Sequence, residues 1–246
     1  MTLSDCLNPS CALFLDFDGT LVEIALRPEA VVVPNHLPDT LGRLRQRLGG
    51  AIAVVSGRPI AQIDRLLAPL VLSVAGVHGA ERRRADGSLA RHAVQTLERV
   101  KDTAMTLVHA HPALRIEAKR GAIALHYREA PHLQPLCLKA MQAAVEKTPG
   151  LTLLCGKMVV EAKPSSATKS RAIDAFMREP PFAGRTAVFI GDDVTDEAGF
   201  ACVQRQGGIG VKVGEGPTAA RLRVADPAAM RAALEQALRA GMERAA

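Results

Sequence analysis

The sequence contains no tryptophan and only one tyrosine among its 246 residues. Aromatic rings are the usual platforms on which proteins stack nucleobases and sugars, so stacking is excluded as a major means of recognition. The net charge of +6 would suit an anionic substrate or a nucleic acid. Its lysines and arginines are scattered, however, and no nucleic-acid-binding motif accompanies them. We therefore expect a small anionic substrate and no nucleic-acid partner.

Long apolar runs are also missing. None approaches the roughly 18–20 residues of a membrane span, and the first residues do not join a basic region to a long apolar stretch. The five cysteines are odd in number and show no CxxC pair, which fits free thiols in a reducing compartment better than a disulfide framework or a zinc site. We expect a cytoplasmic protein with no membrane partner. The sequence carries no signal for an oligomer, so a monomer is the simplest expectation.

Short apolar runs instead alternate with helical patterns in the two outer parts of the chain. The strands are expected at 12–16, 51–56, 71–75, 187–190 and 208–213, and helices lie between them at 38–48 and 196–206. Continuous apolar strands that alternate with helices are typical of a parallel sheet covered on both faces. We therefore predict an α/β fold with a Rossmann-like, doubly wound parallel sheet as its core.

The middle of the chain has a different pattern. Helical segments at 91–111 and 132–147 accompany strand-like segments at 114–119, 121–127, 151–154 and 158–162. Tight turns separate neighbouring strands, which indicates antiparallel hairpins. We predict an inserted α+β cap at 83–162, with the core formed by 1–82 and 163–246 and a helix at 165–177 where the chain returns to it.

Polar residues follow the ends of the expected core strands. Ligands of open α/β sheets bind beyond the carboxyl ends of the strands, so these side chains should meet at one rim. They are Asp16 and Asp18 after the first strand, Ser56, Gly57 and Arg58 after the second, His78 after the third, Asp192 and Asp193 after the fourth, and Lys169 at the helix that follows the cap.

Such a set of groups supports phosphoryl transfer. One carboxylate can attack phosphorus and form an aspartyl-phosphate, and a second carboxylate two residues on can protonate the leaving oxygen and later activate water. A hydroxyl, backbone N–H groups and a lysine ammonium can hold the other phosphate oxygens. Clustered carboxylates repel one another, which a hard cation such as Mg2+ relieves.

The motifs resemble those of the haloacid dehalogenase superfamily of phosphatases. The stretch DFDGTL at 16–21 resembles its DxDGTL signature, and Ser56-Gly57-Arg58, Lys169 and GDDVTDE at 191–197 resemble its second, third and fourth motifs. Within the superfamily, GDDVTDE, GVHGAE at 76–81 and VGEGPT at 213–218 look like the trehalose-6-phosphate phosphatase family. That family also has Glu-x-Lys on one cap strand and a further Glu on a later one, which EAK at 117–119 and Glu161 match.

The resemblance implies a role for each motif residue in a Mg2+-dependent phosphatase of a phosphosugar. Asp16 would be the nucleophile and Asp18 the acid/base, with Ser56 and Lys169 as a clamp on the phosphate. Mg2+ would be held by Asp16, by the backbone carbonyl of Asp18 and by Asp192, with Asp193 or Asp196 supporting it; between these two the sequence does not decide.

The remaining candidates would bind the substrate. Glu117, Lys119 and Glu161 would hold sugar hydroxyls from the cap, and Arg128 is a weaker candidate for the same pocket. Gly57 and Arg58 would lie beside the substrate, while His78 would either face it or shape its own turn.

Several alternatives stay open. The family's third motif is usually Asn-Lys-Gly, whereas this chain has Thr168-Lys169-Ser170, so Lys163 competes for the lysine role. Ser56 could instead cap a helix. The core motifs would equally serve a phosphatase of sucrose phosphate or mannosylglycerate phosphate, or a phosphosugar mutase. A non-catalytic sensor of a phosphorylated ligand is a further alternative, but the intact Asp16, Asp18, Lys169 and Asp192 argue against it.

Overall fold

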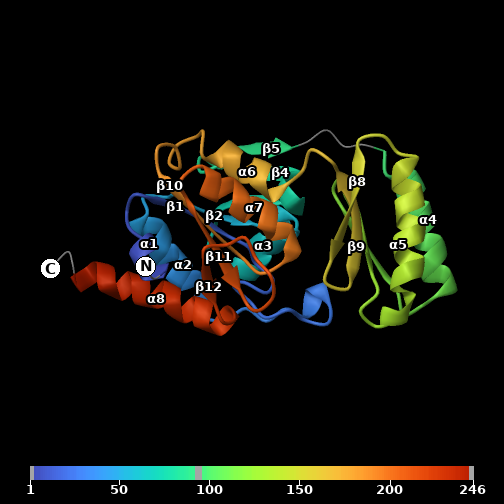
Figure 1. The fold of residues 1–246 in the computed structure, drawn as a ribbon, viewed down its shortest axis with the longest axis horizontal. Helices are drawn as coiled ribbons and strands as arrows, with labels where there is room; N and C mark the ends of the chain where they lie inside the picture. The colour runs from blue at the N-terminus through green and yellow to red at the C-terminus, as the bar shows by residue number, and fades with distance from the viewer. Residues whose placement is uncertain (1–2, 92–95, 244–246) are drawn as a thin grey trace. The chain divides into compact units, whose positions relative to one another are not determined.

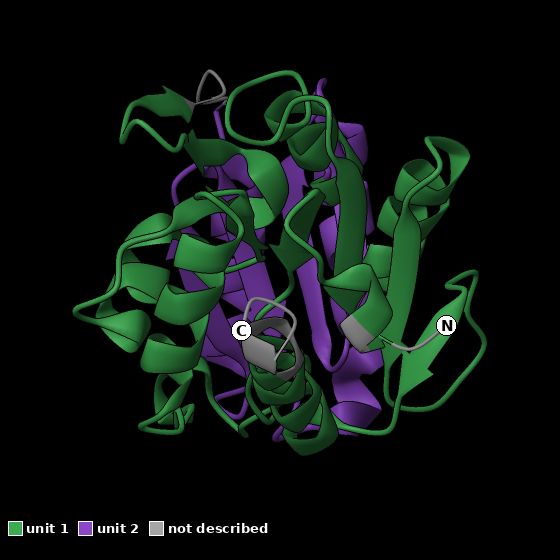
Figure 2. Ribbon diagram, turned by 90° about the vertical axis from the view of Figure 1, so that its left-hand side faces the viewer, with its two compact units in different colours: residues 1–90, 169–246 green, residues 91–168 purple. Residues whose placement is uncertain are grey.

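The computed structural model describes residues 3–91 and 96–243 of the chain (Figure 1). The chain forms two compact units, Met1–Ala90 with Lys169–Ala246, and Arg91–Thr168 (Figure 2). The second unit thus begins at 91 and ends at 168, where the sequence pattern placed its ends at 83 and 162. The difference at the first border arises because two short strands, β4 (Glu81–Arg83) and β5 (Leu89–Arg91), extend the core sheet.

The first unit is built on an eight-stranded sheet in the order β12-β11-β10-β1-β2-β3-β4-β5. The six strands from β12 to β3 are parallel and β4 is antiparallel to β3, which confirms the predicted doubly wound parallel core. Its other strands are β1 (Cys11–Leu15), β2 (Ile52–Val55), β3 (Ser73–Gly76), β10 (Thr186–Gly191), β11 (Ile209–Val213) and β12 (Leu222–Val224).

The central strands are buried along their whole length, which is why they read as continuous apolar runs. All five residues of β1 are buried between β10 and β2. One of them, Phe14, forms an aromatic cluster with Phe176 and Phe182, with ring centroids 5.0–6.0 Å apart. The core therefore fixes the position at which each of these strands ends.

Helices and turns connect the strands of the first unit. The short helix α1 and the helix α2 both pack against the C-terminal helix α8, and α6 packs against α7. The elements are α1 (Leu3–Cys6), η1 (Pro28–Ala30), α2 (Leu37–Arg47), α3 (Ile60–Leu67), η2 (Val77–Gly79), α6 (Lys169–Phe176), α7 (Val194–Arg205) and α8 (Pro227–Glu243). Within residues 3–91 and 96–243, none of the helices has the length and apolarity that a membrane crossing needs.

The second unit is a four-stranded antiparallel sheet in the order β6-β7-β9-β8, with two helices. Apolar side chains of one sheet face, such as Ile123, Leu125 and Val160, share a core with residues of α4 and α5, so the predicted α+β character is confirmed. The elements are α4 (Glu98–Ala110), β6 (Arg115–Lys119), β7 (Ala122–His126), η3 (Pro131–Leu133), α5 (Gln134–Glu146), β8 (Leu151–Gly156) and β9 (Val159–Pro164).

Two helix predictions begin well before the helix does in the structure. The helix expected from residue 91 begins at Glu98, because Arg91 ends β5; residues 92–95 lie outside the described part of the chain. The helix expected from 165 begins at Lys169, because β9 extends to Pro164. This later start places Lys169 in the first turn of α6.

Candidate active site

Asp16 follows β1 directly and stays tied to the sheet. Its backbone N–H donates to the carbonyl of Ile190 on β10 at 2.8 Å, and its side chain is buried. The turn that follows, at Gly19 and Thr20, packs against the carboxylate of Asp192. Gly19 has a φ of +80°, and a Cβ at this position would overlap the carboxylate of Asp192. Thr20, fully buried, donates from Oγ1 to Asp192 Oδ1 at 3.3 Å.

Three buried carboxylates form a cluster at the carboxyl ends of β1 and β10. One oxygen from each of Asp16, Asp192 and Asp196 lies within 4.8 Å of the others. Lys169 Nζ lies 2.8 Å from Asp16 Oδ1 and 2.7 Å from Asp196 Oδ1. The buried ammonium of Lys212 donates to the backbone carbonyl of Asp192. Three carboxyl groups therefore share two ammonium groups, an acidic excess that a divalent cation would balance.

Burial and charge act in opposite directions on the Asp16–Lys169 pair. Burial raises the pKa of Asp16. Lys169 lowers this pKa, whereas the carboxylates of Asp196 and Asp192 raise it, and as a result it lies well above its ordinary value. Burial disfavours the ammonium of Lys169, but Asp16 and Asp196 outweigh it and raise the pKa of this group. The two carboxylates therefore favour the ammonium form of Lys169, and the carboxylates keep a mutual repulsion that a bound cation would remove.

Asp193 and Asp196 have separate places in the structure. Asp196 is fully buried and accepts from the backbone N–H groups of Asp192 and Asp193 at 3.1 and 3.0 Å, as well as from Lys169. Asp193 is the N-cap of α7, where it accepts from Val194 N at 2.9 Å and forms a capping box with Asp196. The structure thus brings Asp196 into the carboxylate cluster and leaves Asp193 at the helix start.

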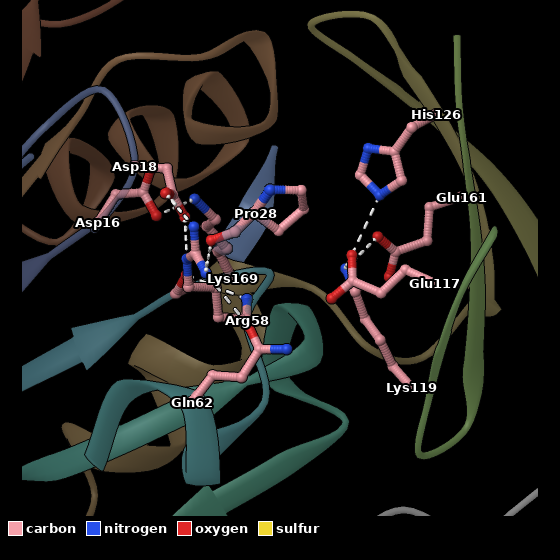
Figure 3. A network of polar contacts seen from close by, with 11 residues as sticks. Asp16, Asp18, Pro28, Arg58, Gln62, Glu117, Lys119, His126, Glu161 and Lys169 are labelled. Atoms are coloured by element: carbon pink, nitrogen blue, oxygen red, sulfur yellow. Dashed lines mark hydrogen bonds and ion pairs between the residues drawn. The ribbon is translucent and has the colours of Figure 1, made fainter. Parts of the chain in front are cut away.

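Asp18 lies two residues beyond Asp16, and its carboxylate forms a two-pronged ion pair with Arg58 (Figure 3). Nε donates to Oδ2 and Nη2 to Oδ1, both at 2.7 Å. The third nitrogen, Nη1, donates to the Pro28 carbonyl at 3.0 Å and to Gln62 Oε1 at 3.2 Å. The side chain of Asp18 is therefore not one of the clustered carboxylates, and Arg58 contacts this aspartate and its own neighbours.

The loop after β2 carries Ser56 in a buried position. Ser56 Oγ accepts from the backbone N–H of Arg58 at 3.1 Å, which leaves its hydroxyl proton to donate elsewhere. Helix α3 begins later, with Pro59 as its N-cap residue. The alternative in which Ser56 caps a helix is therefore wrong.

A left-handed turn after β3 supports this loop. Val77 and His78 have φ of 49° and 55°, a region that a β-branched residue such as valine rarely adopts. His78 N donates to the Ser56 carbonyl at 2.9 Å and Val77 N to the Arg58 carbonyl at 3.1 Å. A Cβ on Gly57 would lie 2.7 Å from Nε2 of His78, so the histidine ring packs on the glycine.

The polar face of the second unit carries a charged cluster. Lys119 Nζ lies 2.7 Å from Glu161 Oε2 and 3.9 Å from Glu117 Oε2. His126 Nε2 lies 3.1 Å from Glu117 Oε2 (Figure 3). Ala124 pairs with Glu117 on β6 and with Glu161 on β9, so a small residue separates the two glutamates across the sheet.

The other two predicted cations lie elsewhere. Arg128 instead binds the backbone of another turn, where its Nη2 donates to the Lys157 carbonyl at 3.0 Å. Lys163 belongs to the second unit, where Nζ donates to the Ala167 carbonyl. Burial lowers the pKa of Lys163. Lys169, and not Lys163, therefore contacts Asp16.

Four residues at these sites were missed by the sequence analysis. Three of them contact predicted site residues through their side chains, and the fourth, Glu81, accepts from a backbone N–H beside the site. A lysine inside a strand or a histidine at its end carries no signal of such a partner. Thr20 contacts Asp192, Lys212 contacts the Asp192 carbonyl, His126 contacts Glu117, and Glu81 accepts from Ile60 N at 2.7 Å at the start of α3.

Comparison with known proteins agrees with this geometry. Residues 14–228 match the model of the family described as trehalose-phosphatase. The chain is 44% identical over 223 residues to the trehalose-6-phosphate phosphatase of Escherichia coli K12, covering 89% of this chain and 83% of that one. It is 45% identical over 205 residues to a probable trehalose-phosphate phosphatase of Sinorhizobium fredii, covering 82% and 77%.

A solved structure has the same fold over nearly the whole chain. It is described as a trehalose-6-phosphate phosphatase related protein, is 27% identical, and superposes with a TM-score of 0.74 over 96% of this chain and 100% of that one. The family match includes Asp16, Ser56, Lys169 and Asp192 within its limits. The chain belongs to the trehalose-phosphatase family, whose members are phosphoric monoester hydrolases.

Proposed function

We propose that this chain hydrolyses trehalose 6-phosphate to trehalose and phosphate, with Mg2+ as its metal and an aspartyl-phosphate on Asp16 as its intermediate. The observation that carries the proposal is the buried Asp16 at the end of β1, 2.8 Å from Lys169 and clustered with Asp192. The names of relatives that cover most of the chain support the choice of substrate.

The reaction would run in two steps with complementary proton transfers. In the first, an oxygen of Asp16 attacks phosphorus, the bond between phosphorus and the sugar oxygen breaks, and Asp18 gives its proton to that oxygen. In the second, Asp18 takes a proton from water as the water oxygen attacks the same phosphorus, and phosphate leaves Asp16. Lys169 and the Ser56 hydroxyl would hold the phosphate oxygens during both steps.

The clustered carboxylates fit a divalent metal. Asp16, Asp192 and the backbone carbonyl of Asp18 would hold Mg2+, whose charge would offset the repulsion of the cluster and of the substrate phosphate. Asp196 would act through others, because it already accepts from Lys169 and from two backbone N–H groups. It would keep the lysine and the Asp192 loop in place.

The charged cluster of the second unit would recognise the sugar. Glu117, Lys119 and Glu161 offer acceptors and a donor of the kind that sugar hydroxyls bind. The match of these three residues to the family's cap residues is the argument for trehalose over sucrose phosphate, mannosylglycerate phosphate or another phosphosugar, since the core chemistry would serve any of them. A phosphosugar mutase would use the same core groups, so the cap residues alone argue against it. A non-catalytic sensor is less well supported, because a sensor needs neither a nucleophile nor an acid/base. Five free cysteines fit the reducing cytoplasm as the location.

A panel of phosphosugars assayed with Mg2+ tests the proposal. We expect a large preference in kcat/KM for trehalose 6-phosphate over sucrose 6-phosphate and glucose 6-phosphate, and Asp16→Asn should release no phosphate from any of them while keeping its circular dichroism spectrum. The variants Glu117→Gln and Glu161→Gln should lose the preference. Equal turnover of all the substrates would overturn the substrate assignment alone, whereas an active Asp16→Asn enzyme would overturn the covalent mechanism.

A further inference from the structure

Arg58 lies at the centre of a hydrogen-bond network in the first unit. Its side chain is only 8% exposed, whereas that of its partner Asp18 is 33% exposed. Four of the five guanidinium N–H groups have partners within the protein: two donate to the Asp18 carboxylate, one to the Pro28 carbonyl and one to Gln62 Oε1. The Phe17 ring lies 5.9 Å from the guanidinium carbon.

This arrangement leaves Arg58 little capacity to bind a substrate. An arginine that recognises phosphate presents two parallel N–H groups to it, and here that pair is directed at Asp18. A substrate phosphate could take it only by displacing the carboxylate. The sequence-based prediction of Arg58 as a substrate-binding residue therefore lacks support from its contacts.

Asp18, in contrast, keeps its capacity to move a proton. A carboxylate has about four lone-pair positions, and the two-pronged contact with Arg58 uses one on each oxygen. The remaining positions are free to carry a proton to a leaving oxygen and to accept one from water. The planar guanidinium at the same time holds the carboxylate plane in one orientation, which a flexible lysine could not do.

We propose that Arg58 is a positioning residue for Asp18: it orients the carboxylate that protonates the leaving sugar oxygen and activates water. The inference rests on the proposed function, in which Asp18 is the acid/base. Pro28 and Gln62 extend the arrangement by fixing Nη1 of Arg58.

The dependence on the leaving group separates positioning from substrate binding. A sugar alkoxide leaves poorly unless it is protonated, whereas p-nitrophenolate leaves without help. The quantity kcat/KM reports the steps up to the first irreversible one, here the loss of the leaving group. A defect in Asp18 should therefore lower kcat/KM for trehalose 6-phosphate and change it little for p-nitrophenyl phosphate. A lost phosphate contact should lower both alike.

The experiment compares Arg58→Lys, Arg58→Gln, Asp18→Asn and the double variant Asp18→Asn/Arg58→Gln on the two substrates with Mg2+. For the Arg58 variants we expect a loss of roughly 100-fold in kcat/KM on trehalose 6-phosphate, the lower end of what general acid–base catalysis contributes, with little change on p-nitrophenyl phosphate. The double variant should be no slower than Asp18→Asn alone, because the two residues act as one unit.

Arg83 supplies a matched control. It also makes a two-pronged pair with an aspartate: Nη2 and Nη1 donate to the Asp64 carboxylate at 2.6 and 2.7 Å, and its side chain is 12% exposed. Arg83→Gln removes an equivalent ion pair of the first unit and should leave kcat/KM unchanged on both substrates. If the Arg58 variants fail to fold by circular dichroism, Gln62→Leu should show the same selective loss at smaller size.

Three results would overturn the inference. One is an equal loss of kcat/KM on both substrates in the Arg58 variants. If Gln62→Leu has to replace them, the corresponding result is that it shows no selective loss on trehalose 6-phosphate. Another is a double variant whose loss is the product of the two single losses. The third is an Asp18→Asn enzyme that loses as much activity on p-nitrophenyl phosphate as on trehalose 6-phosphate. That result would disprove the acid/base role of Asp18, and it is obtained from a variant in which Arg58 is unchanged.

Discussion

At the scale of single residues, Gly57 occupies the most restricted position of the loop after β2. A Cβ there would lie 2.7 Å from Nε2 and 2.8 Å from Cε1 of His78, distances that real Cβ atoms do not show. Gly57→Ala should therefore push the histidine ring and the Ser56 loop apart. Because small misplacements in an active site cost up to about 100-fold in rate, we expect kcat/KM for trehalose 6-phosphate to fall by roughly 10- to 100-fold.

A second substitution tests the physical reason for this loss. Replacing the ring in Gly57→Ala/His78→Ala should restore part of the activity, so the double variant should be faster than Gly57→Ala alone. Gly42→Ala is the control, since the nearest atom to its Cβ would be Leu70 Cδ1 at an ordinary 3.8 Å. The single variant His78→Ala completes the comparison. If the loss in the double variant equals the product of the losses in the two single variants, the ring and the glycine do not act on each other and the explanation fails.

The residues that could be predicted are those whose position follows from the chain itself. Asp16 and Ser56 stand where buried apolar strands end, so their location on the rim follows from the strand pattern. The contact between Asp18 and Arg58 joins residues 40 positions apart, and the turn at Val77 and His78 depends on backbone bonds to another loop. Such pairings are set by packing in three dimensions, and no periodicity in the sequence carries them.

At the scale of elements, two aspartates of one motif have different roles at the start of α7. Asp193 caps the helix, whereas Asp196 faces the carboxylate cluster. Loss of an N-cap costs about 1 kcal/mol, so Asp193→Ala should lower the free energy of urea unfolding by that amount. Asp193→Asn should keep it, since asparagine also caps. Both variants should retain most of their Mg2+-dependent activity; a large loss of activity at unchanged stability would instead identify Asp193 as a metal ligand.

Among the strands of the first unit, the predicted ones are the longer and deeply buried ones. Strands β1, β2 and β10 read as continuous apolar runs because both of their faces are covered. Strands β4, β5 and β12 have three residues each, too few to show any periodicity. Helix α3 was missed since it follows Pro59 within a motif read for its chemistry. Helix α8 (Pro227–Glu243) was not predicted either, so the missing elements include these short edge strands together with α3 and α8.

At the scale of the whole molecule, the carboxylate cluster links stability to pH and to metal. Burial is the largest effect on the pKa of Asp16. Together with the neighbouring carboxylates it outweighs Lys169 and raises this pKa above its value in the unfolded chain. Between the unfolded pKa, about 3.9, and the higher folded one, the folded protein binds more protons than the unfolded chain. Without a metal, its stability should therefore fall as the pH rises through that window. A cation in the cluster favours the ionised form and should oppose this loss.

Differential scanning fluorimetry with MgCl2 against EDTA, at several pH values, measures this linkage. A metal at about 100 times its Kd adds about 2.7 kcal/mol to the free energy of unfolding, which corresponds to roughly 5–11 °C in Tm for a domain of this size. The shift should be largest at neutral pH and shrink as the pH falls and protons compete for the carboxylates. Asp192→Asn removes one of the clustered charges and should abolish most of the shift, while Asp64→Asn, outside the cluster, should preserve it. If Asp192→Asn showed the same Tm shift as the unchanged protein, the cation would bind elsewhere. The repulsion between Asp16 and its neighbours would then be offset by Lys169 and Lys212 alone.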